Sequence, residues 1–434
     1  MGCSQARIDN GAPDQPETWG PEMKKDGPLF WMKKDDMAAI RFSKEGPGSS
    51  DEKQGCPPIT IPELFAKAVK RHGDKCALRV ERIDGKPPPM DAKTKTAAEA
   101  LPADKWVSWT YNEFYQSSSD VAKSLMSLGV EQFGTVAIWG FNAPEWVISL
   151  IGASMAGAKG AGIYPTDTPE QVRFKCKHAD ADVVVLEDLK KYEALKSICE
   201  DLPVLKAIVI YGDKAPEAKI ERKSGDAVQV FDWATFEALG KEKVKDEDLK
   251  ERIAKIKPGH CTALIYTSGT TGRPKAVMIS HDNLIFESKT VNMQVPMFGA
   301  TATCEKLISY LPLSHIAGML IDVAMPMWMT GTSAAWVEMS FARPYDLKIG
   351  SLKDRLVAVK PTLFLGVPRV WEKIAEKLKA VAANLSDFKK KMGGWAKGKG
   401  LEHAKNCQVG GNGKYPPFYG LANKLILSKI KERL

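Results

Sequence analysis

Hydrophobic residues follow two different spacings between residues 110 and 211, and stretches with the two spacings alternate along the chain. Apolar positions three and four residues apart predict amphipathic helices. These helices are expected at 111–128, 143–155, 168–178 and 189–199. Short runs of consecutive apolar or small residues predict buried strands. These strands are expected at 135–139, 158–163, 183–186 and 207–211. Strands that alternate with helices favour an α/β fold of mostly parallel sheets covered by helices on both faces.

The same patterns extend to both sides of this region with more interruptions. A helix from residue 61, a strand at 76–80 and a polar surface insertion at 84–104 are expected before it. After it come charged helices within 212–259 and a series of further elements. The later helices are expected at 282–293, 319–329, 368–382 and 422–433, and the later strands at 307–311 and 361–366.

The first 55 residues are rich in proline, glycine, serine and charged residues, which predicts a flexible N-terminal tail, 1–55, before a folded region, 56–434. The tail begins Met1-Gly2-Cys3-Ser4, so Gly2 is a candidate for myristoylation and Cys3 for palmitoylation. Ala6 stands where the myristoylation pattern prefers serine or threonine. An unmodified tail is therefore the alternative.

Charge and cysteine usage restrict the class of protein further. The net charge is +9, which favours anionic partners such as nucleotides, CoA or an acidic membrane. No zinc-finger spacing or RNA-binding motif accompanies it, so a nucleic-acid partner is not expected. Eight scattered cysteines and the lack of a secretory signal indicate a reducing compartment. We expect a cytoplasmic protein, not secreted, with peripheral contact to the endoplasmic reticulum or another membrane as an open alternative.

A loop between two predicted strands carries the most specific chemistry of the chain. Ten residues from Tyr266 to Lys275 contain two glycines, four aliphatic hydroxyls and a lysine. Such a loop can surround a polyphosphate, because glycines allow close approach of the backbone and hydroxyls donate hydrogen bonds. Charge-assisted bonds from the lysine strengthen the binding. The candidate binding residues are Thr267, Ser268, Gly269, Thr270, Thr271, Gly272 and Lys275.

The spacing excludes a Walker-type phosphate loop. That loop has four residues between its glycines, a lysine directly after the second, and a helix that follows. Here Gly269 and Gly272 are three positions apart, and Arg273 and Pro274 separate the second from the lysine. A plain hairpin turn rich in small residues is the alternative.

Four other segments have weaker signals. Residues 309–316 read Ser-Tyr-Leu-Pro-Leu-Ser-His-Ile, which places His315 between a strand and a helix. Residues 140–146 and 366–371 contain glycine, asparagine and proline at expected turns and helix starts, and Trp371 is expected to be a core or pocket-wall residue. The lysine-rich run 389–399 is expected to be a flexible solvated loop or a contact with an anionic membrane.

The loop from Tyr266 to Lys275 resembles the signature of the adenylate-forming enzymes, which include acyl-CoA synthetases. From about residue 58 to residue 434 the chain is similar to long-chain acyl-CoA synthetases of the bubblegum type. The resemblance implies a long-chain fatty acid–CoA ligase that uses ATP, Mg²⁺ and CoA, and it makes 56–434 an incomplete N-terminal AMP-binding domain. It implies catalytic roles for Lys275 and Thr267, contact of Thr267 with Mg²⁺, and an acyl-site lining role for His315.

One departure from the family pattern concerns the motifs expected further on. The family has an aromatic-Gly-x-Thr-Glu motif, a ribose-binding aspartate, a hinge and a small C-terminal domain with a catalytic lysine, and residues 276–434 contain none of them. This predicts that the chain is inactive by itself. The alternative is a non-catalytic, membrane-associated protein that binds acyl chains or nucleotides.

Overall fold

The computed structural model describes residues 59–91, 93–94, 96–223, 225–267, 274–294, 303–383, 385–408 and 411–429. The predicted tail 1–55, with Gly2 and Cys3, lies outside these residues. The chain divides into two compact units, Met1–Leu363 and Phe364–Leu434. Each unit is described by itself.

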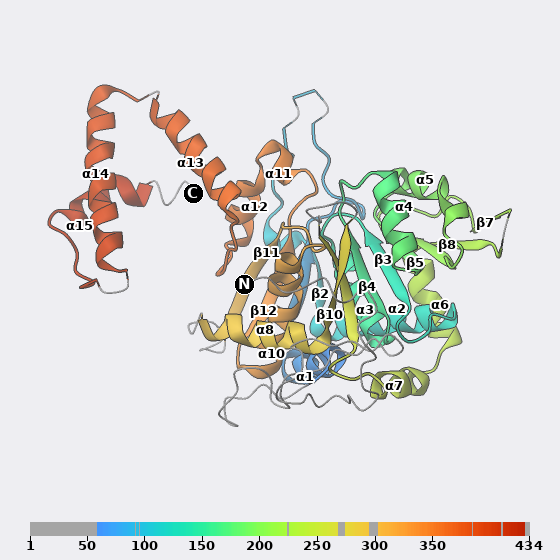
Figure 1. Ribbon diagram of the computed structural model, residues 1–434. Coiled ribbons are helices and arrows are strands. Elements are labelled where there is room, and N and C mark those ends of the chain that lie inside the picture. Colours follow the sequence, from blue (N-terminus) through green and yellow to red (C-terminus); the bar gives the residue numbers. More distant parts are fainter. Residues whose placement is uncertain are drawn as a thin grey trace, which may run out of the picture. The chain divides into compact units, whose positions relative to one another are not determined.

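The first unit is built around an eight-stranded sheet (Figure 1). The strand order is β10-β9-β4-β3-β5-β6-β8-β7. All neighbours are parallel except the two edge pairs, β10 with β9 and β7 with β8. The strands are β3 (Thr135–Trp139), β4 (Lys159–Ile163), β5 (Ala181–Leu186), β6 (Ala207–Ile210), β7 (Lys219–Ile220), β8 (Val228–Asp232), β9 (Cys261–Thr267) and β10 (Lys275–Ser280). The prediction of a mostly parallel sheet is confirmed.

The first unit also contains a four-stranded sheet. Its order is β11-β12-β1-β2, with β11, β12 and β1 parallel and β2 antiparallel to β1. The strands are β1 (Cys76–Val80), β2 (Val107–Thr110), β11 (Cys304–Ser309) and β12 (Trp336–Phe341). The β11–β12–β1 ladder brings residues 78–80 beside 339–341, so the N-terminal and C-terminal parts of the unit fold together.

Helices cover both faces of the eight-stranded sheet, because alternate side chains of its strands are apolar. In β3, Val136 and Ile138 enter one core, while Ala137 and Trp139 enter the other. The first core also takes residues from α1, α2, α3 and α10, and the second takes residues from α4 and α5. These helices are α1 (Ile61–His72), α2 (Tyr111–Ser127), α3 (Pro144–Met155), α4 (Pro169–His178), α5 (Leu189–Lys196) and α10 (Met325–Thr332).

The remaining helices of the first unit connect the sheets or cover their ends. They are α6 (Trp233–Lys243), α7 (Asp246–Ala254), α8 (His281–Gln294), α9 (Ile316–Met319), a π-helical turn η4 (Leu320–Ala324), α11 (Asp346–Ile349) and α12 (Leu352–Val359). Ser280 caps α8 as a reciprocal pair with Asn283, in which each side-chain oxygen accepts from the other backbone N–H at 3.1 Å. A single helix was expected at 319–329. In the structure this stretch is the end of α9, the π-helical turn η4 and the first part of α10.

A buried ion network fixes the polar insertion expected as a surface loop at 84–104. Arg343, nearly inaccessible to solvent, donates two hydrogen bonds of 2.8 Å to the Glu81 carboxylate. It also donates to the backbone carbonyl of Ala98 at 2.8 Å. Arg355 pairs with the same carboxylate from the other side. The insertion is therefore anchored to the end of the four-stranded sheet, because a buried guanidinium needs these acceptors.

The second unit is helical. It contains α13 (Pro368–Ala383), α14 (Asp387–Asn406), α15 (Tyr419–Ala422) and a π-helical turn, η5 (Asn423–Leu427). The prediction of a flexible loop at 389–399 is wrong, because α14 includes this run. The prediction of a strand at 361–366 is also wrong. The backbone N–H groups of Thr362 and Leu363 donate to the Lys306 carbonyl of β11, and the Lys306 N–H donates to the Thr362 hydroxyl, but no strand forms. Trp371, expected in a core, is 53% exposed.

Candidate active site

The predicted phosphate loop is closed by an antiparallel hairpin. Lys275 of β10 pairs with Thr267 of β9, so the two described ends of the loop lie opposite each other. Both side chains are exposed. Ser268, Gly269, Thr270, Thr271 and Gly272 lie outside the described residues. The structure therefore brings Thr267 and Lys275 together at the mouth of the loop, in an arrangement that fits a ligand bound between them.

The loop lies at the carboxyl edge of the eight-stranded sheet. Because β9 runs parallel to β4, Thr267 ends its strand on the same edge as Ile163 of β4. The preceding Tyr266 is buried, and its hydroxyl donates to the Lys175 carbonyl of α4 at 3.0 Å. Burial raises the pKa of Tyr266 well above its ordinary value, so it stays a neutral donor. This bond holds the end of β9 against α4 and so fixes the root of the loop.

The segment before His315 is held by Asn142, which follows β3. The Asn142 amide nitrogen donates to the Ser309 hydroxyl at 2.8 Å and to the Leu311 carbonyl at 2.7 Å. Its amide oxygen accepts from the Leu313 backbone N–H at 3.2 Å. These three bonds fasten the end of β11 to the carboxyl end of β3. The helix-start role expected for this asparagine is wrong, because α3 has no side-chain cap bond.

The same segment packs directly on β4. A Cβ on Gly162 would lie 2.6 Å from the Ser314 Cα, so only glycine allows this contact. β4 neighbours β9, the strand that ends in Thr267. The 309–315 segment therefore packs on the strand next to the one that leads into the phosphate loop. The pairing of these two motifs could not be deduced from their spacing in the sequence.

His315 stands at the start of α9 and is exposed. Its Nδ1 accepts the Ala317 backbone N–H at 3.2 Å, as an N-cap. A neutral imidazole with an accepting Nδ1 carries its proton on Nε2. The ring is therefore oriented by the helix and presents an N–H donor away from it.

A series of hydrogen-bonded polar side chains leads from this segment into the mostly apolar helical stretch 319–329. Ser309, which accepts from Asn142, also hydrogen-bonds the carboxyl group of Asp322 in η4. Burial raises the pKa of Asp322 to about 8, and the Ser309 bond opposes this only in part. π-Helical turns often occur at functional sites. The linking roles of Asn142, Ser309 and Asp322 were not predicted from the sequence; a lone aspartate inside the apolar run 319–329 was the available signal for Asp322.

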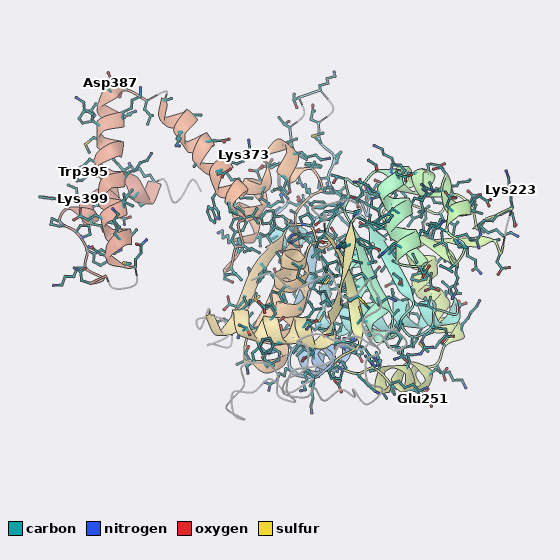
Figure 2. All side chains as sticks on the ribbon, viewed as in Figure 1. Lys223, Glu251, Lys373, Asp387, Trp395 and Lys399 are labelled. Atoms are coloured by element: carbon teal, nitrogen blue, oxygen red, sulfur yellow. The ribbon has the colours of Figure 1, made fainter. Side chains whose placement is uncertain are left out.

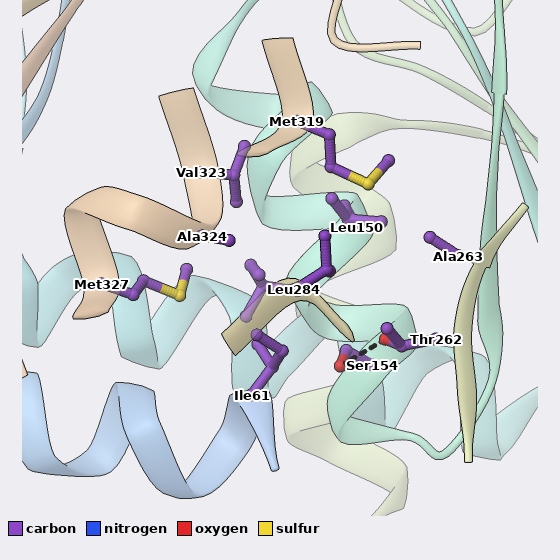
Figure 3. Close-up of a pocket in the computed structure, with 11 residues that line it drawn as sticks. Ile61, Leu150, Ser154, Thr262, Ala263, Leu284, Met319, Val323, Ala324 and Met327 are labelled. Atoms are coloured by element: carbon purple, nitrogen blue, oxygen red, sulfur yellow. Dashed lines mark hydrogen bonds between the residues drawn. The ribbon is translucent and has the colours of Figure 1, made fainter. Parts of the chain in front are cut away.

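A small apolar cavity lies beside α9, η4 and α10 (Figure 3). The helical stretch that begins after His315 forms one wall with Met319, Val323 and Met327. The other walls come from α1, α3, α8 and β9. The cavity is also lined by Ile61, Leu150, Ile151, Ala263, Leu284 and Ala324. Its polar end is satisfied internally, since Ser154 and Thr262 share a hydrogen bond of 2.9 Å. The walls are apolar, but the cavity volume is about 10 Å³, which is room for about one water molecule.

The described residues contain no preformed metal centre. Among them, no group of three or more His, Cys, Asp or Glu side chains could hold a metal ion. Mg²⁺ often binds through substrate phosphates and one or two protein oxygens. The exposed hydroxyl of Thr267 fits such a limited role. Across the same described ranges, no helix is long and apolar enough to cross a bilayer.

The fold and site define an adenylate-forming protein, and comparison with known proteins supports this class. Residues 89–416 match the family model described as "AMP-binding enzyme". The chain therefore belongs to the AMP-binding enzyme family.

Curated relatives narrow the family further. The chain is 38% identical to long-chain-fatty-acid–CoA ligase ACSBG2 of Xenopus laevis over 87% of its own length and 46% of the relative. The chicken ACSBG2 is 36% identical over 97% of this chain and 51% of the relative. Human ACSBG1, also named a long-chain-fatty-acid–CoA ligase, is 35% identical over 87% and 47%. The chain thus spans about half the length of the curated relatives it matches.

Solved structures confirm the fold. The adenylation domain of a carboxylate reductase from Mycobacterium chelonae matches with a TM-score of 0.55 at 19% identity, over 76% of this chain and 49% of that one. A long-chain-fatty-acid–CoA ligase from Archaeoglobus fulgidus matches with a TM-score of 0.53 at 17% identity, over 75% and 55%. The expected architecture of an adenylate-forming N-terminal domain is confirmed.

Proposed function

We propose that this chain forms the nucleotide- and acyl-binding part of a long-chain fatty acid–CoA ligase. In the proposed reaction a fatty-acid carboxylate oxygen attacks the α-phosphorus of ATP. The bond from this phosphorus to the bridging oxygen breaks, and pyrophosphate leaves. The sulfur of the CoA thiolate then attacks the acyl carbon of the acyl-adenylate, and AMP leaves with the electron pair of the broken C–O bond.

One observation carries the proposal: the ends of the phosphate loop and the His315 segment lie on neighbouring strands at the carboxyl edge of one sheet. Thr267 is the last residue of β9 and Lys275 the first residue of β10. Ser314 packs on β4, which neighbours β9. The cavity is walled by the helical stretch that follows His315. The cavity reaches β9 at Thr262 and Ala263, near the start of the strand. In the proposed complex the fatty acid extends along β9, with its tail toward this cavity and its carboxylate at the carboxyl edge beside the nucleotide, and holding two anions together in this way is a large part of catalysis.

The residues have distinct proposed roles. Lys275 and the loop hydroxyls, Ser268, Thr270 and Thr271, bind the triphosphate. They neutralise the charge that grows at phosphorus, which is usually the largest single contribution to such catalysis. The Thr267 hydroxyl holds Mg²⁺, which would screen the phosphate charges when bound. His315 orients the fatty-acid carboxylate through its Nε2–H. Burial of the tail contributes about 0.8 kcal/mol per CH₂.

Calorimetric titration with Mg·ATP tests the nucleotide site in the chain itself. A bond to a charged group contributes about 1.5–3 kcal/mol, so Lys275→Ala should weaken ATP binding roughly 10- to 100-fold. Lys255→Ala is the matched control, because Lys255 is an exposed lysine at the end of α7. Equal ATP affinity in the wild type and Lys275→Ala would contradict the proposal.

A second candidate function is binding without catalysis. It is favoured by residues 276–434, which contain none of the motifs that the family resemblance assigns to adenine and ribose binding. In this case the chain would bind ATP and fatty acid without forming acyl-adenylate. For either function we propose a cytoplasmic setting with peripheral membrane contact, supported by the six described cysteines, which are all free.

A further inference from the structure

The positive charge of the chain is concentrated in the second unit. Residues 385–429 contain nine lysines and two acidic residues, a net charge of +7, whereas the whole chain has +9. The rest of the protein is therefore close to neutral. Such a concentration of one sign on a small unit creates a local field that attracts anionic surfaces.

Most of these lysines belong to α14, on which Figure 2 labels Asp387, Trp395 and Lys399. Lys390, Lys397, Leu401 and Lys405 follow one another at spacings of seven, four and four, and all are exposed. These residues therefore share one face of the helix. We call this set the basic face. The opposite face, with Ala396 buried and Trp395 and His403 partly buried, packs on α15 and η5.

Large apolar side chains are exposed beside these lysines. Phe388 at the start of α14 is 74% exposed, and Phe418 before α15 is 69% exposed. Leu401 and Leu421 are each more than half exposed. Phe418 also has a φ of 65°, a left-handed conformation that is unfavourable for a bulky residue. A glycine or asparagine would suit this backbone better, so the phenyl ring has a cost that folding alone does not explain.

The exposure does not arise from an open or unpaired segment. His403 stacks on Tyr415, with ring centroids 4.5 Å apart, and lies tilted against Tyr419 at 4.4 Å. The Asn406 amide donates to the Lys414 carbonyl at 2.9 Å. α14 and the following segment thus form a hairpin with its own internal contacts. The apolar side chains that remain outside are available to a partner.

We propose that this hairpin, residues 387–429, docks on the surface of an anionic lipid bilayer. Lysine side chains attract acidic headgroups, and their aliphatic stems can lie along the acyl boundary while the ammonium groups stay in water. Exposed phenylalanine and leucine side chains beside them provide the apolar burial that interfacial helices need. This inference deepens the membrane contact proposed above and does not depend on acyl activation.

The composition favours lipid over nucleic acid. Residues 385–429 contain no arginine, although arginine is the residue that recognises phosphates in bidentate geometry. The exposed leucines also have no role along a phosphate backbone. Nucleic-acid binding is therefore an outcome to be tested against the proposal.

Flotation with lipid vesicles tests the proposal on the 434-residue chain. The wild type should float with vesicles that contain phosphatidylserine and should remain unbound with pure phosphatidylcholine vesicles. The variant with Lys390, Lys391, Lys397 and Lys405 all changed to Gln should bind on the order of tenfold or more weakly. The control variant has four exposed lysines of the first unit changed to Gln. Its vesicle binding should be close to that of the wild type, and its substitutions are Lys177→Gln, Lys190→Gln, Lys250→Gln and Lys255→Gln.

A second pair of measurements separates insertion from charge attraction alone. Leu401→Gln with Leu421→Gln should weaken binding without a change of charge, and Phe418→Trp should have its fluorescence quenched by brominated lipids. The proposal is overturned if the two lysine variants bind alike, if the tryptophan is not quenched, or if duplex DNA competes the chain off vesicles. Vesicle binding needs no nucleotide, so its failure would leave the proposed acyl activation untouched.

Discussion

Asn142 is the residue that joins the end of β3 to the segment preceding His315. Its side chain is buried and makes three hydrogen bonds, of 2.7–3.2 Å, to residues of this segment. Alanine would leave the Leu313 N–H and the Leu311 carbonyl without this partner. Buried groups without partners cost about 1–3 kcal/mol each, so Asn142→Ala should lower the free energy of unfolding by about 2–4 kcal/mol.

Urea unfolding followed by tryptophan fluorescence measures this loss. Ser149→Ala is the control, since Ser149 is buried but makes one local helical bond, to the Glu145 carbonyl at 2.7 Å. Its substitution should cost no more than about 1.5 kcal/mol. Equal losses for the two variants would show that Asn142 does not act as a clamp.

The cavity behind α9, η4 and α10 gives a prediction at the scale of elements. Ala324 lines this cavity from η4, so Ala324→Phe should fill part of the space for an acyl tail. Exclusion of a few methylenes at about 0.8 kcal/mol each should weaken binding of a fluorescent long-chain fatty acid at least ~10-fold. ATP affinity should stay unchanged, and Ala254→Phe, on the exposed end of α7, should affect neither ligand. Unchanged fatty-acid affinity would place the acyl site elsewhere.

A second element-scale prediction concerns the contact between α1 and the start of α8. His281 is buried, and its Nδ1 accepts the Ile61 backbone N–H at 3.2 Å, which requires a neutral ring. Burial and the neighbouring His260 lower the pKa of His281 to about 3. In the unfolded chain the ordinary pKa is about 6.5, so the unfolded state binds a proton first as the pH falls. The stabilisation is complete above about pH 6.5 and is lost progressively toward pH 3.

The measurement compares urea unfolding of the wild type and His281→Asn at pH 7 and pH 5. The wild type should lose more stability on acidification, by up to about 1.4 kcal/mol per pH unit below 6.5. Asp322 contributes in the opposite direction, because its raised pKa favours the folded state at lower pH. Both proteins contain Asp322, so its contribution cancels when the pH dependence of the free energy of unfolding of His281→Asn is subtracted from that of the wild type. Parallel pH profiles would exclude His281 as the source.

The sequence analysis succeeded where local patterns determine structure and failed where distant residues meet. Strands such as β3 and β5 were predicted because each contains a run of four consecutive apolar residues, Val136 to Trp139 and Val183 to Leu186, and both faces of these runs are buried. The contact of Asn142 with Ser309 spans 167 positions, which no local pattern contains. In α14 four glycines, which disfavour helices, suggested a loop. The packing of α14 on α15 and η5 overrides this preference.

At the scale of the whole molecule, ATP binding and catalysis separate into two questions. Lys275 and Thr267 lie together, so we expect the 434-residue chain to bind ATP. Formation of acyl-adenylate also needs the adenine and ribose held in line with the carboxylate. The motifs that the family resemblance assigns to these tasks do not occur in residues 276–434.

We therefore expect no fatty-acid-dependent exchange of labelled pyrophosphate into ATP by the purified chain, even at saturating ATP. The binding titration serves as the control, because a chain that binds ATP without exchange has an intact loop and lacks only alignment. Exchange above the level of Lys275→Ala would show that residues within 1–434 align the nucleotide by themselves. The edge of the sheet around Tyr164, which follows β4 beside the loop's own strand β9, would then be the first place to look for these contacts.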